Sequence, residues 1–354
     1  MTRARPFGAL AALLLGCSSA RAPLLPMTEL EAEEARVDPE VRALLAGLDK
    51  PPARIAASMP PAESARRDRA RWASLKPFTA PHREVARVQD LSAEGPQGPV
   101  PLRVFWPSSD ADRAPLVVYL HGGEYTAGSL DLYDSTCRAL ARGAHAVVVA
   151  VAYRLAPQAR FPAPSADVSA AMRWILAHAG ELHADVGRVA LAGDDAGAAL
   201  AVASAVELAQ GGGPPLRALA LAYPLLDARL RSASWREFGA LPYLLTRDDF
   251  SRALGMYLDG ASVEDPRVSP VLLGTAELSK LPRTLLLTAE LDPARDDAEV
   301  FAAALHKAGG AAEVRRSSGM VHGFLLLAGA VEPAAQALDG LAAWLREALE
   351  DRPL

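Results

Sequence analysis

The sequence predicts an α/β protein with a mainly parallel, doubly wound sheet, helices on both sheet faces and a helical cap. Short apolar segments rich in β-branched residues or leucine recur along the chain and alternate with longer helical segments. This alternation is typical of parallel sheets whose crossover connections are helices. A polar and aromatic stretch at residues 228–262 interrupts the alternation and predicts an insertion that folds over the strand ends.

The expected strands share a short apolar run that ends at glycine, proline or a charged residue. The stretches between most of them have the length and composition of helices. The expected strands are 116–120, 146–151, 189–192, 218–222 and 284–288, and the expected helices are 166–178, 196–209 and 295–308.

Two helical stretches precede the first strand-like residues. One begins at Pro39, where Asp38 is placed to cap it and apolar residues recur at three-to-four spacing. The other is polar, covers residues 62–72 and follows a proline-rich break. Because both precede every strand, we expect them to cover the sheet, so the predicted cap comprises about 37–75 and 228–262.

The first 17 residues are typical of an exported lipoprotein signal. Arg3 and Arg5 precede a short apolar run that is too short to span a bilayer, which needs ~20 apolar residues. The run ends in Leu-Leu-Gly-Cys at Cys17, which resembles a bacterial lipobox, so we expect Cys17 to carry lipid. A plain secretory signal cleaved nearby is the alternative.

A lipid on Cys17 would be the only membrane anchor, and it would place the protein in the bacterial cell envelope. Ser18 after this cysteine favours the outer membrane. Residues 18–36 are an expected tether, and residues 37–354 are the expected folded domain. Cys137 is the only other cysteine, so an intrachain disulfide is not expected in the lipidated protein.

The charge balance gives no reason to expect a nucleic-acid partner. The formal net charge is −5, the pI is about 5.9, and lysine and arginine form no run that would make a basic patch. A hydrophobic content of 51% is ordinary for a packed globular protein.

The strand at 116–120 leads directly into His121, Gly122 and Gly123. Glycines at this point let backbone N–H groups approach a reacting carbonyl oxygen, which predicts part of an oxyanion hole. A tight strand-to-helix turn without any catalytic role is the alternative.

A second turn, Gly193-Asp194-Asp195-Ala196-Gly197, follows another buried strand and opens an alanine-rich helix. Small residues at both ends permit the strained nucleophile elbow, which would present Asp195 above the sheet and make the Ala196 N–H an oxyanion donor. A helix N-terminus that simply favours acidic residues explains the two aspartates equally well.

Asp292 lies just past the expected strand at 284–288, and His322 follows it by 30 residues. A carboxylate and a histidine on neighbouring strand ends form the general-base half of a catalytic triad, in the order nucleophile, acid, base. A lone histidine on a surface loop is the alternative for His322.

These motifs occur in the order and at the spacing of one family. The sequence resembles the hormone-sensitive-lipase family of carboxylesterases, which have the α/β-hydrolase fold, over residues 37–350. The resemblance implies an esterase for short-chain or aromatic esters that uses no cofactor and no metal. The further matching motifs are Tyr-Arg-Leu-Ala-Pro at 153–157, Phe-Pro-Ala at 161–163 and Ser-Pro at 269–270.

The resemblance also implies a role for each matching residue. His322 is the general base, Asp292 orients it, and Asp194 braces the elbow. The expected oxyanion donors are Gly122, Gly123 and Ala196, and the expected pocket residues beside them are His121, Glu124, Tyr125 and Asp194.

The sequence departs from the family pattern at two positions. The family's nucleophilic serine corresponds to Asp195, and its third small residue after His121 corresponds to Glu124. Both changes add a carboxylate where negative charge must develop, which opposes an oxyanion. Carboxylates on both sides of His322 would also favour the imidazolium, so the histidine would be a poor base near neutral pH.

Three functions therefore stay open. The first is a slow ester hydrolase in which a carboxylate activates water. The second is an aspartate-nucleophile hydrolase acting on epoxides or haloalkanes, and the third is a non-catalytic protein that binds a small apolar or aromatic ester-like ligand. The candidate leaving-group donors for the second are Tyr125, Tyr243 and Trp235, and the candidate replacement nucleophiles are Ser204, Ser317 and Ser318.

Overall fold

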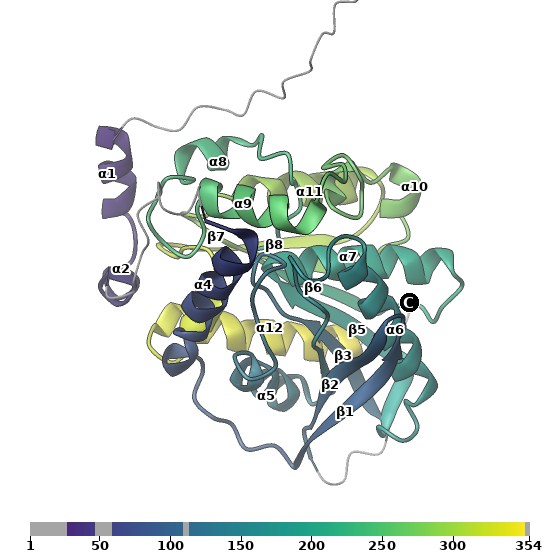
Figure 1. Cartoon of the computed structure of the whole chain (residues 1–354). Coiled ribbons are helices and arrows are strands. Elements are labelled where there is room, and N and C mark those ends of the chain that lie inside the picture. Colours follow the sequence, from purple (N-terminus) through teal and green to yellow (C-terminus); the bar gives the residue numbers. More distant parts are fainter. Residues whose placement is uncertain (1–26, 47–58, 109–112, 351–354) are drawn as a thin grey trace, which may run out of the picture.

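The computed structural model describes residues 27–46, 59–108 and 113–350. It contains one eight-stranded sheet in the order β1-β2-β4-β3-β5-β6-β7-β8 (Figure 1). β1 and β2 pair antiparallel, and β2 meets β4 antiparallel, whereas β3 to β8 are parallel to one another. The predicted fold class, a mainly parallel α/β sheet of the α/β-hydrolase type, is confirmed.

The central strands are the buried segments that the sequence predicts, and the edge strands are more exposed. β6 has the expected bounds, whereas β5 begins earlier and ends at Asp194. β1, β2 and β8 were not among the five predicted segments, because charged residues occupy most exposed positions of β1 and β8, and glycine or proline occupies those of β2. The strands are β1 Arg87–Gly95, β2 Gly98–Trp106, β3 Ala114–Leu120, β4 Val147–Val151, β5 Ala184–Asp194, β6 Ala218–Ala222, β7 Arg283–Ala289 and β8 Ala312–Ser317.

Helices cover both faces of the sheet, as the alternation of elements predicts. Residues of α6, α7 and α11 belong to one apolar core, and residues of α5 and α12 belong to the core on the other face. The helices are α1 Met27–Ala35, α2 Pro39–Ala46, α4 Pro61–Ala73, α5 Asp134–Ala144, α6 Ala163–Ala177, α7 Asp195–Gln210, α8 Ala233–Glu237, α9 Arg247–Leu258, α10 Thr275–Leu278, α11 Arg295–Lys307 and α12 Glu332–Glu350, with short 3-10 turns at Lys76–Phe78, Pro270–Leu272 and Phe324–Leu327.

The parallel strands β3, β5, β7 and β8 all end at the same edge of the sheet. In parallel sheets the loops at the carboxyl ends of the strands are where ligands and catalytic groups gather. The loops that follow these strands carry His121, Asp195, Asp292 and His322. The topology therefore brings together residues that are distant in the sequence.

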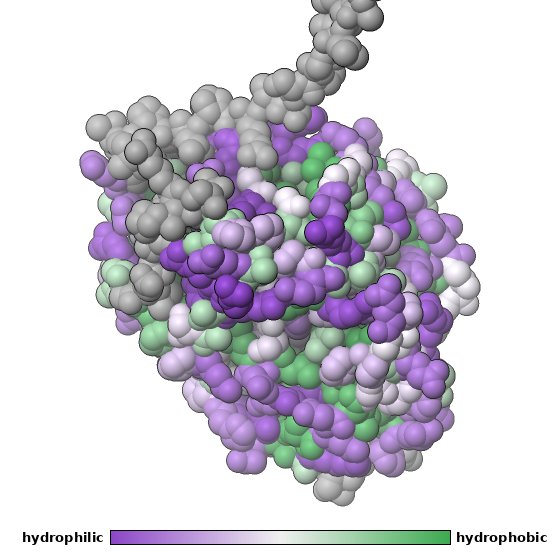
Figure 2. Space-filling model, in the orientation of Figure 1, coloured by the Kyte–Doolittle hydropathy of each residue, from purple (hydrophilic) through white to green (hydrophobic). Residues whose placement is uncertain are grey.

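The two stretches that the sequence assigns to a cap contact each other. Arg71 of α4 pairs with Asp249 of α9 at 3.2 Å, and Arg252 of α9 pairs with Asp249 at 2.9 Å and with Asp68 of α4 at 3.3 Å. We call Asp68, Arg71, Asp249 and Arg252 the cap network. Figure 2 shows hydrophilic residues over α4, as expected for a helix whose outer face meets water.

The cap stretches also contact the body of the protein near the strand ends. The Arg69 Nε of α4 donates to the Thr126 carbonyl at 2.9 Å, in the loop after β3. Leu244 lies against Gly323, beside His322. These contacts place α4 and the 228–262 stretch next to the loops that carry the candidate catalytic residues.

The N-terminal prediction is partly outside the described residues. Residues 1–17, with Cys17, and residues 18–26 of the expected tether lie there. Residues 27–35 of that tether form helix α1. Asp38 caps α2 as expected, because its Oδ1 accepts the Glu40 N–H at 2.9 Å. No helix in the described part of the chain is long and apolar enough to cross a membrane.

Candidate active site

The turn between β5 and α7 has the geometry of a nucleophile elbow. Asp195 has φ = 52°, in the left-handed region that a side chain other than glycine rarely adopts. A Cβ added to Gly197 would lie 2.1 Å from the Leu120 carbonyl oxygen, and one added to Gly193 would lie 2.8 Å from the same oxygen. Only glycine fits at these two positions, so the turn is as tight as the small residues in the sequence predict.

The Asp195 carboxylate is held by backbone N–H groups on one side. Its Oδ1 accepts from the Gly123 N–H at 3.2 Å, from the Glu124 N–H at 2.8 Å and from the adjacent Ala196 N–H. These three donors converge on one point, as the donors of an oxyanion hole do. The aspartate side chain itself occupies that point.

The other Asp195 oxygen faces His322. The His322 Nε2 lies 2.9 Å from Asp195 Oδ2, and its Nδ1 lies 2.9 Å from Asp292 Oδ2. Asp292 Oδ1 in turn accepts the Ala294 N–H at 2.8 Å. We call Asp195, His322 and Asp292 the triad network.

The triad network is closed to solvent, with side-chain exposures of 0% for both aspartates and 1% for His322. Burial alone would lower the pKa of His322, but the adjacent carboxylates of Asp292 and Asp195 outweigh it and raise the pKa to about 10. The ring is therefore an imidazolium at neutral pH, and each ring nitrogen donates to one carboxylate.

Asp194 braces the turn from below. Its Oδ1 accepts from the Tyr119 hydroxyl at 2.8 Å and from the Gly122 N–H at 2.9 Å, and its Oδ2 accepts from the Tyr133 hydroxyl at 2.8 Å. Burial, followed by the nearby Asp195 charge, raises the pKa of Asp194 to about 7. Asp194 thus ties the elbow to the loop after β3 and to α5.

One predicted oxyanion donor is wrong. The Gly122 N–H was expected to point at the site, but Asp194 accepts it instead. The third donor is the N–H of Glu124, a residue predicted to line the pocket but not to donate to the oxyanion. Gly123 and Ala196 lie where they were expected.

His121 shapes the loop without contributing charge. Its ring stacks on Tyr153 with centroids 4.5 Å apart, and the Tyr153 hydroxyl donates to the His121 carbonyl at 2.5 Å. Burial lowers the pKa of His121 to about 4, so the ring is neutral. In that state its Nδ1–H donates to the Gly122 carbonyl at 2.9 Å.

Glu124 lies beside Asp195 in a strained conformation. It has φ = 53°, and 5% of its surface is exposed. Burial, followed by the negative charges of Asp195, Asp249 and Asp68, raises the pKa of its carboxyl well above the ordinary value. Glu124 therefore lies at the junction between Asp195 and the cap network, where its surroundings disfavour the charged form of its carboxyl.

The three candidate leaving-group donors contact other residues. The Tyr125 ring stacks on Tyr257 with centroids 3.9 Å apart and rings 2° from parallel. The Tyr243 hydroxyl lies 3.3 Å from a Glu34 carboxyl oxygen, and the Trp235 indole N–H donates to Asp297 at 2.8 Å. The stacking and hydrogen-bond contacts of these three residues are thus made with Tyr257, Glu34 and Asp297.

Sequence reasoning missed three tyrosines of the site. Tyr119 and Tyr133 hold Asp194, and Tyr223 packs edge-on against the His322 ring with centroids 5.0 Å apart. All three are fully buried in the apolar core. A tyrosine in an apolar strand or helix has the same sequence signal whether its hydroxyl is used or not, so nothing in the sequence separates them from other core residues.

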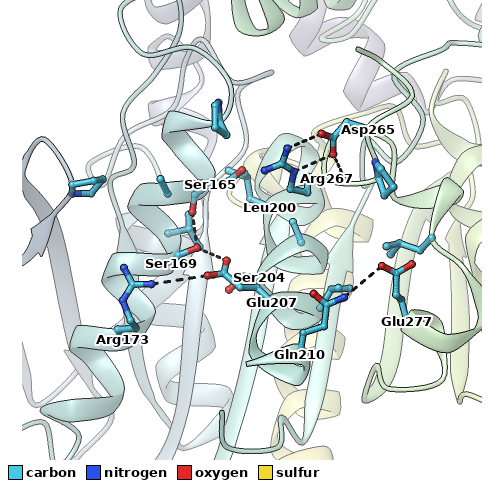
Figure 3. Close-up of a pocket in the computed structure, with 18 residues that line it drawn as sticks. Ser165, Ser169, Arg173, Leu200, Ser204, Glu207, Gln210, Asp265, Arg267 and Glu277 are labelled. Carbon is cyan, nitrogen blue, oxygen red and sulfur yellow. Dashed lines mark hydrogen bonds and ion pairs between the residues drawn. The ribbon is translucent and has the colours of Figure 1, made fainter. Parts of the chain in front are cut away.

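None of the candidate replacement serines lies in the elbow. Ser204 is more than two turns along α7 and lines a cavity of 650 Å³ between α6, α7 and the 265–277 segment (Figure 3). That cavity is not lined by any residue of the triad network. Ser317 ends β8, and Ser318 is exposed. Asp195 is the side chain that the elbow presents.

Among the described residues, no group of three or more histidine, cysteine, aspartate or glutamate side chains is arranged to hold a metal ion. The Cys137 thiol is free and buried.

The sheet, the elbow and the acid–histidine pair define the chain as an α/β hydrolase, and a family model described as an α/β-hydrolase fold matches residues 117–326. Carboxylesterase NlhH of Mycobacterium tuberculosis is 42% identical over 250 residues, which cover 70% of this chain and 78% of that protein. Esterase LipI of the same species is 38% identical over 312 residues, covering 87% and 93%. A solved esterase of Pyrobaculum calidifontis has a TM-score of 0.78 and 31% identity, covering 88% of this chain and 98% of that chain.

The chain therefore belongs to the carboxylesterase-like α/β-hydrolase family that includes hormone-sensitive lipase.

Proposed function

We propose that this protein is a carboxylesterase-family α/β hydrolase in which Asp195, at the position of the family's nucleophilic serine, prevents ordinary ester hydrolysis. The observation that carries the proposal is the position of its carboxylate. Asp195 Oδ1 takes the N–H groups of Gly123, Glu124 and Ala196, so an ester carbonyl cannot receive them. An esterase needs those donors for the oxyanion, and losing one alone costs roughly 10²–10³-fold in rate.

Attack by Asp195 on an ester carbonyl leads back to reactants. The tetrahedral adduct would have to expel an alkoxide, whose conjugate acid has a pKa near that of water, ~15.7. Its competing leaving group is the Asp195 carboxylate, with a reference pKa of about 3.9. The weaker base leaves, so the adduct returns to the free ester.

Direct attack by water meets a different obstacle. A base must remove a proton from the water, and His322, with a pKa of about 10, already carries its proton at neutral pH. Asp292 and Asp195 are both engaged with that imidazolium. Water activation in the resting protein is therefore slow.

The ligand that suits the proposal is a small apolar or aromatic ester-like molecule that enters under the predicted cap of about 37–75 and 228–262. Residues 47–58 of this cap lie outside the described residues. The relatives named above are esterases, which supports this ligand class. A lid over the triad network would exclude water and shape the apolar site. No cofactor, metal or nucleic acid has a role in the proposal.

The Cys17 prediction gives the proposed location, which is the bacterial cell envelope with lipid as the only anchor. Cys17→Ala should release the protein from the membrane fraction or leave it unprocessed. Recovery of the unaltered protein entirely in a soluble fraction would contradict the lipid anchor.

Asp195→Ser tests the proposed function. The change restores a serine with His322 and Asp292 behind it and empties the oxyanion hole, so activity on a short aryl ester should rise at least ~10³-fold above the parent. The parent should be close to the uncatalysed rate. Strong parent esterase activity that survives Asp195→Ala would show that another group is the nucleophile.

A further inference from the structure

The cavity between α6 and α7 has no part in the proposed function. It has a volume of 650 Å³, and its lining comes mainly from α6, α7 and residues 265–277 (Figure 3). Asp195, Asp292 and His322 are not among its lining residues. Pockets for small organic molecules have volumes of about 300–1,000 Å³, so this space is large enough for such a ligand. We call it the α6–α7 cavity.

The inner wall of the α6–α7 cavity is apolar. Val168 of α6 and Leu200 of α7 are each 1% exposed and belong to the apolar core on that face of the sheet. Val206 and Leu273 also line the cavity, and both are partly buried against the same core. An apolar group that enters the cavity therefore leaves water for an apolar surface, which favours binding.

Charged side chains surround the same space. Three carboxylates and two guanidinium groups line the cavity, so the formal charge of its lining is −1. One carboxylate is already neutralised, because Asp265 accepts from two nitrogens of the Arg267 guanidinium at 3.0 Å and 2.7 Å. The remaining charged groups of the lining are Glu207, Glu277 and Arg173.

Glu207 has a weak cationic partner. The Arg173 Nη1 lies 4.0 Å from Glu207 Oε1, and the two side chains are 70% and 58% exposed. An ion pair at this distance and exposure contributes little. The Ser169 hydroxyl donates to the other carboxylate oxygen. A carboxylate has about four acceptor positions, so Glu207 can accept further hydrogen bonds from a ligand.

Glu277 lies at the same end of the cavity. In the described residues its carboxylate meets uncharged donors, the Gly274 N–H at 2.9 Å and the Gln210 side-chain amide at 3.5 Å. Gln210 is one turn after Glu207 on α7, so it connects the two carboxylates (Figure 3). α7 also ends at Gln210, and the partial negative charge of its last carbonyl groups favours a cation at this end.

We propose that the α6–α7 cavity binds a small organic ammonium ion whose apolar body lies against α6 and α7. An ammonium group has three N–H donors, which match the open acceptor positions of Glu207 and Glu277. A carboxylate ligand would be repelled by these two charges, and a neutral ligand would gain nothing from them. The cavity is separate from the triad network, so the proposal goes beyond the proposed function and does not depend on it.

Three probes with one apolar body separate the contribution of charge from that of shape. They are 4-phenylbutylamine, 4-phenylbutan-1-ol and 4-phenylbutanoate. Titration calorimetry of the full chain at pH 7 should show saturable binding of the amine. The alcohol should bind about 5-fold more weakly, which is the upper value for an exposed ion pair, and the carboxylate more weakly still.

Two variants test the charge and the space separately. The double change Glu207→Gln and Glu277→Gln should weaken amine binding about 5-fold and leave alcohol binding unaltered, because it removes charge and keeps shape. Ala203→Phe places a ring in the cavity that Ala203 lines and should remove binding of both probes. Glu84→Gln is the matched control, because the Glu84 side chain is 88% exposed and does not line the cavity.

Backbone amide shifts locate the amine without any substitution. Amine binding should move the ¹H–¹⁵N signals of residues 200–210 and leave those of Asp292 and His322 in place. This measurement decides the location even if Ala203→Phe fails to fold, which thermal unfolding would reveal.

The proposal is overturned if the amine shows no saturable binding or binds no more tightly than the alcohol. It is also overturned if folded Ala203→Phe or the double glutamine variant binds the amine as the parent does. Amine binding that moves the signals of Asp292 and His322 instead would place the ligand under the cap. Failure of the proposed function is a different result, because it shows as strong parent activity on an aryl ester.

Discussion

The triad network and the cap network are both ion-pair networks that join distant parts of the chain, but water reaches only one of them. The side chains of the triad network are 0–1% exposed, whereas those of the cap network are 15–18% exposed. In the triad network Asp195, Asp292 and His322 all have protein partners on their polar atoms. In the cap network solvent can replace part of each contact.

This difference in solvent exposure explains why a substitution in the triad network should change the chemistry of the site, whereas one in the cap network should not. Charges interact strongly where water is excluded, so the Asp292 and Asp195 carboxylates together keep His322 protonated. In the cap network each charge is screened by solvent, so a change there alters stability by a small amount. A substitution of Asp195 should therefore change both the chemistry of the site and the stability of the protein.

The largest expected effect is on activity. In an Asp195→Ser background, His322→Ala should remove at least ~10³-fold of the restored esterase rate, because the serine loses its base. In the parent background, the same His322→Ala change should leave the low aryl-ester rate almost unaltered. Initial rates for the four proteins form a double-mutant cycle. Equal losses in both backgrounds would mean that His322 already works as an esterase base in the parent.

The next effect is on stability. Asp195→Ala should lower the free energy of unfolding by about 3–5 kcal/mol, because it leaves a buried imidazolium and three buried N–H groups without their partner. Urea unfolding followed by circular dichroism measures it. Asp339→Ala, at a carboxylate that is 56% exposed, should cost less than about 1 kcal/mol. A cost for Asp195→Ala as small as that of this control would contradict the account.

The triad network should also give stability a pH dependence. The pKa of His322 rises from 6.5 to about 10 on folding, so folding favours the protonated ring. Its contribution is therefore complete below pH 6.5 and is lost as the pH rises through about 10, with a slope of about 1.4 kcal/mol per pH unit in between. Unfolding free energies from pH 6 to 10 should fall more steeply in the parent than in Asp195→Ala. Parallel curves would mean that Asp195 does not hold the proton.

The smallest effect is expected in the cap network. Arg252→Ala removes contacts to Asp249 and Asp68 that are half-buried, so it should cost about 1 kcal/mol. Arg346→Ala removes an exposed pair with Glu350 and should cost less than about 0.5 kcal/mol. Thermal unfolding of the two variants ranks them. A larger loss for Arg346→Ala would reverse the argument from burial.

The buried parts of the fold were predictable from the sequence, and the edges were not. β6 and β7 are continuous apolar runs between breakers, and this signal places a central parallel strand directly. β8 is an edge strand with mostly exposed residues, so its composition is that of a loop. The short connections between strands then determine which residues meet at the carboxyl ends.

The sequence predicted which side chains meet in the site, but it did not predict which backbone N–H groups form the oxyanion hole. The motifs bring Asp195, His322 and Asp292 together because each follows a parallel strand. The identity of the third oxyanion donor depends on Asp194, which takes the Gly122 N–H and leaves that of Glu124 for the hole. Such a choice between adjacent N–H groups depends on backbone angles that the sequence pattern does not encode.

The protonation state of His322 tests the central claim most directly. The ¹⁵N chemical shifts of its two ring nitrogens, recorded from pH 6 to 10.5 in the parent and in Asp195→Ser, report whether both nitrogens carry protons. The account predicts an imidazolium in the parent up to about pH 10 and a clearly lower pKa in Asp195→Ser, because only Asp292 remains beside the ring. A neutral ring in the parent at pH 7, or the same pKa in both proteins, would contradict the claim that Asp195 holds His322 in its protonated form.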